Sequence, residues 1–173
     1  MSTEGFNGVA GGSATGIRTL EAGDLPALRA VIDANELFPG EMLDGMAEAH
    51  LRGDGGELWF TAVDGVPVGL AYCAPERMTE GTWNLLLIAV RPDLHGAGVG
   101  SSLMARVEGE LASLGARVLL VETSGLPGFA RTRGFYVARG YDEEARIREF
   151  YQAGEDKVVF RKAIGTKAPL DAG

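Results

Sequence analysis

The sequence almost lacks cysteine, since Cys73 is the only one among 173 residues. A single cysteine cannot form a disulfide within the chain, which favours a reducing compartment such as the cytoplasm. Cys73 and the two histidines lie far apart, so the sequence predicts no metal site. We interpret Cys73 as a small core residue rather than a nucleophile.

Long apolar runs and an excess of positive charge are also missing. No apolar stretch reaches the roughly 18 residues of a transmembrane helix, and the N-terminus lacks the pattern of a secretory signal. The chain carries 16 Lys and Arg against 24 Asp and Glu, a formal net charge of −8. This balance argues against binding to nucleic acid or to a membrane surface. It is compatible with a cationic substrate such as an amine.

The residues that are present suit one globular domain. Hydrophobic residues make up 46% and charged residues 23% of the chain, close to the average for soluble domains. We expect the domain to cover residues 17–163. Residues 1–16, which are rich in glycine and small polar residues, and residues 164–173 are expected to be flexible tails.

The hydrophobic patterning predicts an α/β fold. A hairpin turn at Asp64-Gly65 demands antiparallel strands, whereas a strand–helix–strand unit after residue 82 demands parallel ones. The sheet should therefore be mixed, in the order β-α-α-β-β-β-α-β-α-β-β. Strands are predicted at 17–20, 58–63, 66–73, 82–90, 118–123, 146–151 and 157–161, and helices begin at Asp24, near Pro39, after the glycines of 96–100 and at Pro127.

The segment after the strand at 82–90 is the most informative one. It places Gly96, Gly98 and Gly100 at alternate positions directly before a helix. Free backbone N–H groups at a helix start form an anion site. A dinucleotide-binding G-x-G-x-x-G motif does not fit, because its sixth position is Ser101, and the lysine of a phosphate-binding loop is absent. A tight turn without a ligand remains the alternative at this point.

Two motifs in this chain resemble those of the GNAT (GCN5-related N-acetyltransferase) superfamily. Ile88-Ala89-Val90-x-Pro92-x-x-His95-Gly96-x-Gly98-Val99-Gly100 is similar to its pyrophosphate-binding segment, Gln/Arg-x-x-Gly-x-Gly/Ala, with His95 in place of Gln or Arg. Phe135-Tyr136-Val137-Ala138-Arg139-Gly140-Tyr141 resembles its second signature, an aromatic pair before a Gly-aromatic step. The resemblance covers residues 17–163 and implies a splayed central sheet flanked by helices.

The resemblance also implies acetyl-CoA as cosubstrate and an amine as the second substrate, with a homodimer as a possible assembly. Backbone groups of the strand end would pair with the pantetheine arm, and those of the glycine turn would bind the pyrophosphate. The cofactor-binding residues expected on this basis are Ile88, Ala89, Val90, His95, Gly96, Ala97, Gly98, Val99, Gly100 and Ser101.

Two side chains are candidates for proton transfer. Tyr136, four residues before Gly140, matches the family tyrosine that protonates the departing sulfur, and a phenol is protonated at neutral pH. Glu122 ends an apolar strand and resembles the proposed base of ribosomal-protein acetyltransferases. Glu80, or a chain of waters without a dedicated base, is the alternative to Glu122. No activated cysteine is evident, which favours direct transfer.

Two residues near these candidates bear on the cofactor. Arg133 is expected to reach the CoA phosphates, to pair with Glu122 or to lie on a solvated helix face. Phe129 falls where many members of the superfamily have an asparagine that touches the cofactor.

The sequence therefore predicts an acetyl-CoA-dependent N-acetyltransferase whose acceptor is open. A protein N-terminus, a small amine, an amino acid or a drug all remain candidates, and the acyl group could differ from acetyl. Residues 39–50 and the strand at 146–151, with Phe150 or Tyr151, are expected to line the acceptor pocket. A non-catalytic acyl-CoA-binding or sensor module is the alternative, since it would keep the glycine turn without needing Tyr136.

Overall fold

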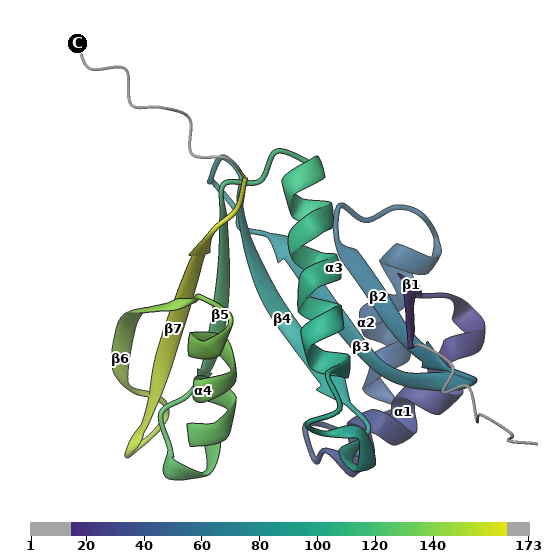
Figure 1. Ribbon diagram of the computed structural model, residues 1–173, viewed down its shortest axis with the longest axis horizontal. Coiled ribbons are helices and arrows are strands. Elements are labelled where there is room, and N and C mark those ends of the chain that lie inside the picture. Colours follow the sequence, from purple (N-terminus) through teal and green to yellow (C-terminus); the bar gives the residue numbers. More distant parts are fainter. Residues whose placement is uncertain (1–14, 166–173) are drawn as a thin grey trace, which may run out of the picture.

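The computed structural model describes residues 15–165 as a seven-stranded mixed sheet with helices on both faces (Figure 1). The strand order is β1-β2-β3-β4-β5-β7-β6. The tails expected at 1–16 and 164–173 fall almost wholly outside the described residues. The elements are β1 Gly16–Thr19, α1 Leu25–Ala34, α2 Met42–Leu51, β2 Leu58–Asp64, β3 Val66–Pro75, β4 Thr82–Val90, α3 Val99–Ser113, β5 Val118–Ser124, α4 Ala130–Ala138, β6 Asp142–Gln152 and β7 Glu155–Ala163.

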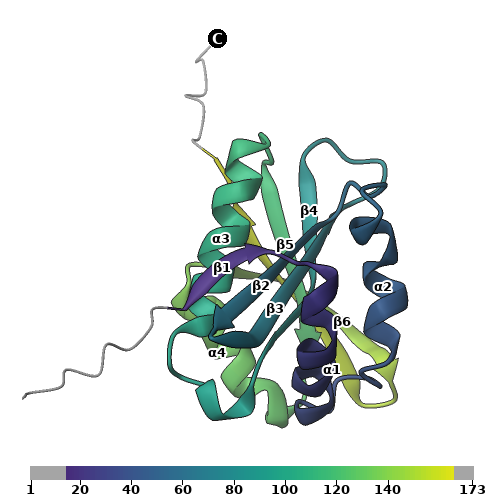
Figure 2. The same ribbon diagram turned by 90° about the vertical axis from the view of Figure 1, so that its right-hand side faces the viewer.

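The helices lie in two layers, with α3 and α4 on one face of the sheet and α1 and α2 on the other (Figure 2). Each layer buries its own apolar cluster. Leu103, Val107 and Leu111 of α3 pack with Val121 of β5 in the first cluster. Leu28 and Ile32 of α1 pack with Leu43 of α2 and Leu87 of β4 in the second. In α1 and α3 the apolar positions that predicted the helix are therefore the surfaces that fix it to the sheet. In α2 the buried residues are Leu43 and Ala47, and Met42, which the apolar spacing had favoured, is exposed.

The predicted order of elements is confirmed, and the differences are local. Strands β6 and β7 are longer than expected, and the predicted helix at 127–139 begins with a 3-10 turn, Pro127–Phe129, before α4. Asp24 directly precedes α1 but does not cap it with its side chain. Its carboxylate instead accepts hydrogen bonds from Arg18 at 2.7 and 2.8 Å and from Thr61 at 3.0 Å.

The sheet splays between its two central strands. β4 and β5 pair in parallel only from Thr82–Val118 to Leu85–Val121, and beyond this point the strands diverge (Figure 1). The second half of β4 therefore has β3 on one side and no strand on the other. Its backbone edge is open to any group that can hydrogen-bond as a strand does.

A β-bulge at Leu86 adjusts β4 at the point where the strands part. The register with β3 moves from Cys73–Leu85 to Tyr72–Leu87, which leaves Leu86 as the extra residue. Because of this extra residue, Leu85 belongs to the cluster under α3 while Leu87 belongs to the cluster under α1 and α2. Within residues 15–165, none of the helices is both long and apolar enough to span a membrane.

Candidate active site

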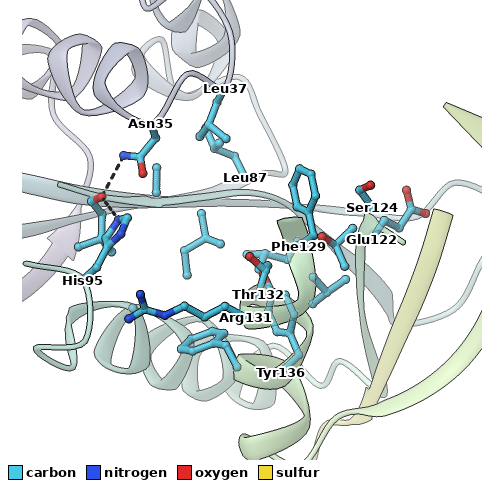
Figure 3. A pocket seen from close by; sticks show the side chains of 18 of the residues that line it. Asn35, Leu37, Leu87, His95, Glu122, Ser124, Phe129, Arg131, Thr132 and Tyr136 are labelled. Atoms are coloured by element: carbon cyan, nitrogen blue, oxygen red, sulfur yellow. Dashed lines mark hydrogen bonds between the residues drawn. The ribbon is translucent and has the colours of Figure 1, made fainter. Parts of the chain in front are cut away.

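A cleft of about 830 Å³ lies where β4 and β5 diverge. Both strand ends, the glycine turn, α4, the connection between α1 and α2 and the hairpin of β6 and β7 contribute to its walls. Figure 3 shows His95 and Glu122 at opposite ends of this cleft, with Tyr136 between them. The cleft thus brings together the strand end, the turn and both candidate proton-transfer residues from distant parts of the sequence.

The glycine turn presents backbone donors at the start of α3. Gly96 and Gly98 have φ angles of +82° and +89°, a conformation that favours glycine, and Gly98 caps the helix without a side chain. Among residues 15–165, the backbone N–H groups of Val99, Gly100 and Ser101 have no hydrogen-bond acceptor. Three free donors at the positive end of a 15-residue helix make the expected anion cradle.

His95 lies in this turn, but its ring is directed to the end of β4. Its Nε2 lies 2.8 Å from the carbonyl oxygen of Val90, which also accepts a hydrogen bond from Asn35 Nδ2 at 2.9 Å (Figure 3). A carbonyl only accepts, so Nε2 carries the proton in this contact. His95 therefore fastens the turn to the strand and does not aim Nε2 at a ligand in the cradle.

Two arginines of the α4 segment bring positive charge to the turn instead. Arg131 lines the cleft, and its Nη2 lies 3.6 Å from the point where a Cβ atom of Gly96 would be. Its side chain extends across the cleft toward the end that holds His95 (Figure 3). Arg139 follows α4 and donates a hydrogen bond to Ser101 Oγ at 2.5 Å. The hydroxyl of Ser101 is therefore already engaged.

Arg133 is not part of the cleft wall. Its guanidinium donates to the carbonyl oxygens of Ser124 at 2.8 Å and Leu126 at 2.9 Å, and so joins α4 to the end of β5. It neither pairs with Glu122 nor lies free on a helix face. Arg133 was the arginine predicted as a candidate for the CoA phosphates, but Arg131, two residues earlier, is the one that faces the turn.

Tyr136 is almost wholly buried, with 3% of its surface exposed, yet it lines the cleft. Its ring packs against Phe135, Tyr141 and Phe160 at centroid distances of 5.3 to 5.7 Å. Burial raises the pKa of its phenol well above the ordinary value of 10. No residue of 15–165 hydrogen-bonds to the hydroxyl, so a protonated and unpaired O–H is held at the cleft wall.

Glu122 lines the same cleft from β5, with a side chain about one-third exposed. Lys157 of β7 forms an ion pair with its Oε2 at 2.9 Å, and Asn84 Nδ2 lies 3.4 Å from Oε1. Lys157 also lies 3.6 Å from the centroid of the Phe150 ring. Lys157 could not be predicted as a partner of Glu122 from sequence patterns, because only the pairing of β5 with β7 brings the two residues together.

Tyr136 and Glu122 belong to opposite faces of the splayed sheet. Tyr136 lies in the apolar cluster under α3, together with Val121 of β5. Glu122 follows Val121 directly, and successive side chains of a strand point to opposite faces. The cleft therefore opens to both faces, with the phenol and the glycine turn on one and the carboxylate on the other.

Glu80, the alternative base, and Cys73, the expected core residue, both lie outside the cleft wall. Glu80 does not line the cleft, and its backbone carbonyl accepts a hydrogen bond from Arg117. Cys73 is fully buried in the core, and burial raises the pKa of its thiol to about 12. A thiol that stays protonated is a poor nucleophile. The described residues contain no group of three side chains suited to hold a metal ion.

The sequence of the chain matches the acetyltransferase (GNAT) family. The family's sequence model matches residues 25–141, which include the splayed strands, the glycine turn and α4. The chain belongs to this family.

Individual relatives agree with this assignment. The chain is 28% identical over 97 residues to an uncharacterized N-acetyltransferase of Methanocaldococcus jannaschii, a match that spans 54% of this chain and 60% of that protein. A structure from Desulfovibrio desulfuricans assigned to the GNAT family is 32% identical, with a TM-score of 0.81 over 87% of this chain and 99% of that one.

More distant solved structures share the fold. The ribosomal-protein-S18-alanine N-acetyltransferase of Escherichia coli has a TM-score of 0.73 at 22% identity, over 92% of this chain and 99% of that one. A phosphinothricin acetyltransferase of Sinorhizobium meliloti, solved with acetyl-CoA, has a TM-score of 0.73 at 17% identity, over 92% and 96% of the two chains.

Proposed function

We propose that this protein transfers an acetyl group directly from acetyl-CoA to a primary amine. The observation that carries the proposal is the cleft itself. It has an open strand edge and an anion cradle, with an unpaired phenol on one face and a carboxylate on the other. These are the groups that amide formation from a thioester requires, since an amine must lose a proton and a thiolate must gain one.

The features of the cleft fit acetyl-CoA as the acetyl donor. The free N–H groups of Val99, Gly100 and Ser101 suit the pyrophosphate, with Arg131 beside them. The open edge of β4 at Ile88 and Ala89 suits the amide groups of the pantetheine arm, whereas the carbonyl oxygen of Val90 is already engaged by His95 and Asn35. A phosphinothricin acetyltransferase of the same fold has been solved with acetyl-CoA, which supports this assignment.

Glu122 on one face of the sheet acts on the amine, and Tyr136 on the other face acts on the departing sulfur. Glu122 accepts the proton of the incoming ammonium, directly or through a water, and the nitrogen then attacks the thioester carbonyl carbon. A backbone N–H of β4 near Ala89 stabilises the oxyanion that forms. The C–N bond is complete in this intermediate, and its collapse breaks the C–S bond. Tyr136 gives its proton to the departing sulfur, and the extra proton on the nitrogen passes through water to the resulting tyrosinate. Cys73 is fully buried and takes no part, so the acetyl group does not pass through a cysteine thioester.

Arg131 is expected to govern affinity for the phosphates of the acetyl donor. Arg131→Ala should raise KM for acetyl-CoA by roughly tenfold, the value of a charge-assisted hydrogen bond, and leave kcat near that of the parent. Steady-state kinetics with acetyl-CoA and with acetylpantetheine, which lacks the phosphates, checks this. Arg52→Ala, which removes an exposed arginine from the end of α2, is the matched control. Equal losses with both donors would contradict the assignment.

Glu122 is expected to act on the amine. Glu122→Gln keeps an oxygen for Lys157 but cannot take up a proton, so kcat/KM for the amine at pH 7 should fall about tenfold. This loss is smaller than the usual rate contribution of a general base, because a water can also accept the proton. The loss should shrink as pH rises and the free amine deprotonates in solution. A pH profile of both proteins measures this, and a loss that stays constant with pH would make Glu122 structural.

A further inference from the structure

The end of the cleft that holds Glu122 is lined by apolar and negatively charged side chains. This inference rests on the proposed function, which assigns the face with Tyr136 and the glycine turn to acetyl-CoA. The acceptor then enters from the opposite face, where Glu122 lies. The connection between α1 and α2, the bulge of β4 and the hairpin of β6 and β7 surround this entrance.

Exposed apolar side chains surround the entrance. Leu37 from the α1–α2 connection, Leu86 from the bulge and Tyr151 from β6 all line the cleft, with 46% to 52% of their surfaces exposed. Phe38 also lines it and packs against the cluster under α1 and α2. Large apolar side chains gathered around one concave site are typical of a ligand surface, because each remains in water until a ligand covers it.

The charges at this end are negative. Glu122 and Glu155 both line the cleft there, whereas Arg131 extends toward the opposite end (Figure 3). The pKa of Tyr151 is raised first by burial and then by the negative charges of Glu122 and Glu155. The phenol of Tyr151 therefore lies near both carboxylates. The ammonium group of Lys157 is already held by Glu122 and the Phe150 ring. Of the described residues that line the cleft, none at this end offers a free cation.

We propose that the acceptor is a primary amine with an apolar group beside the amino carbon and no carboxylate close to the amine. The two carboxylates attract the ammonium form, and the rim of Leu37, Leu86 and Tyr151 covers the apolar group. Lys157 offsets the charge of Glu122, so an acceptor with its own carboxylate would bring a second uncompensated negative charge beside Glu155, without a free cation to meet it. The N-terminus of a peptide that begins with a bulky apolar residue and a small apolar amine share this chemistry.

A series of amino-acid α-amides tests the proposal, since their amino groups have similar basicity. With saturating acetyl-CoA, kcat/KM for phenylalanine amide should exceed that for alanine amide by about tenfold or more, the effect of filling an apolar pocket. The amide of glutamic acid, which keeps its side-chain carboxylate, should be about tenfold poorer than alanine amide. The tripeptide amide phenylalanyl-alanyl-alanine amide separates the two sources. If the natural acceptor is a peptide, kcat/KM for this tripeptide should exceed that for phenylalanine amide. If it is a small amine, kcat/KM for the tripeptide should be lower.

Two variants connect the preference to the rim. Leu37→Ser should reduce the ratio of kcat/KM for phenylalanine amide to that for alanine amide several-fold. Leu114→Ser, which changes an exposed leucine directly after α3, should leave this ratio unchanged. A preference for glutamic acid amide or spermidine would contradict the proposed class of acceptor but would still support acetyl transfer to an amine. If acetyl-CoA binds and none of the amines is acetylated, the transferase function fails, and the acceptor class fails with it.

Discussion

Replacing Tyr136 with phenylalanine should lower kcat by roughly 10²- to 10³-fold, the contribution of a positioned general acid. The ring packs among Phe135, Tyr141 and Phe160, and a phenylalanine ring keeps those contacts. No hydrogen bond of residues 15–165 is lost with the hydroxyl. The fold and the affinity for acetyl-CoA should therefore stay close to those of the parent, which stopped-flow kinetics and equilibrium titration can measure side by side.

Tyr141→Phe is the control, because its hydroxyl donates to Glu108 at 2.8 Å, away from the cleft. That variant should keep its kcat. The pKa of Tyr136 is raised by burial, so the phenol keeps its proton throughout the neutral range. The parent kcat should thus show no decline from this group below about pH 10. A Tyr136→Phe protein with parental kcat would remove the general acid from the mechanism.

Placing a negative charge in the glycine turn should abolish useful binding of acetyl-CoA. Gly98 has a φ of +89°, and open space surrounds the point where its Cβ would be. Aspartate tolerates this backbone conformation better than most residues. Its carboxylate would face the anion cradle, and two unit charges about 6 Å apart near a protein surface repel by about 3 kcal/mol. The Kd for CoA should rise on the order of 100-fold.

Gly98→Asn has the same shape and backbone preference without the charge, so it isolates the electrostatic effect. Its Kd should rise by far less than that of Gly98→Asp. Calorimetric titration with CoA measures both, and thermal unfolding shows whether either variant has lost its fold. Equal Kd values for the two variants would mean that no phosphate lies in the turn.

The fold could be predicted because its signals are local. Alternating apolar residues mark the strands, the Asp64-Gly65 turn marks the first hairpin, and the glycines of 96–100 mark where a strand enters a helix. The bulge at Leu86 could not be predicted. It lies within a continuous apolar run, and only the register with β3 shows which residue is extra.

The backbone geometry of the candidate site could be predicted from the sequence, and the contacts of its side chains could be predicted less well. The turn and Tyr136 have fixed spacings from neighbouring glycines, so the motifs located them. The partners of Glu122 and the roles of the arginines depend on contacts across the sheet. Lys157 reaches Glu122 through the pairing of β5 with β7, and Arg131 rather than Arg133 faces the turn because of its position on α4. Periodicity in one short helix does not resolve such a choice.

The most direct test of acetyl transfer in this cleft follows both products of one reaction. The purified protein is incubated with acetyl-CoA and phenylalanine amide, while free CoA thiol is measured by colour and the N-acetylated amide by mass. The account predicts equal amounts of thiol and N-acetyl product, formed only when amine is present, with no acetylated protein as intermediate. Tight binding of CoA without N-acetyl product from any primary amine would contradict it, and would make the protein an acyl-CoA-binding module.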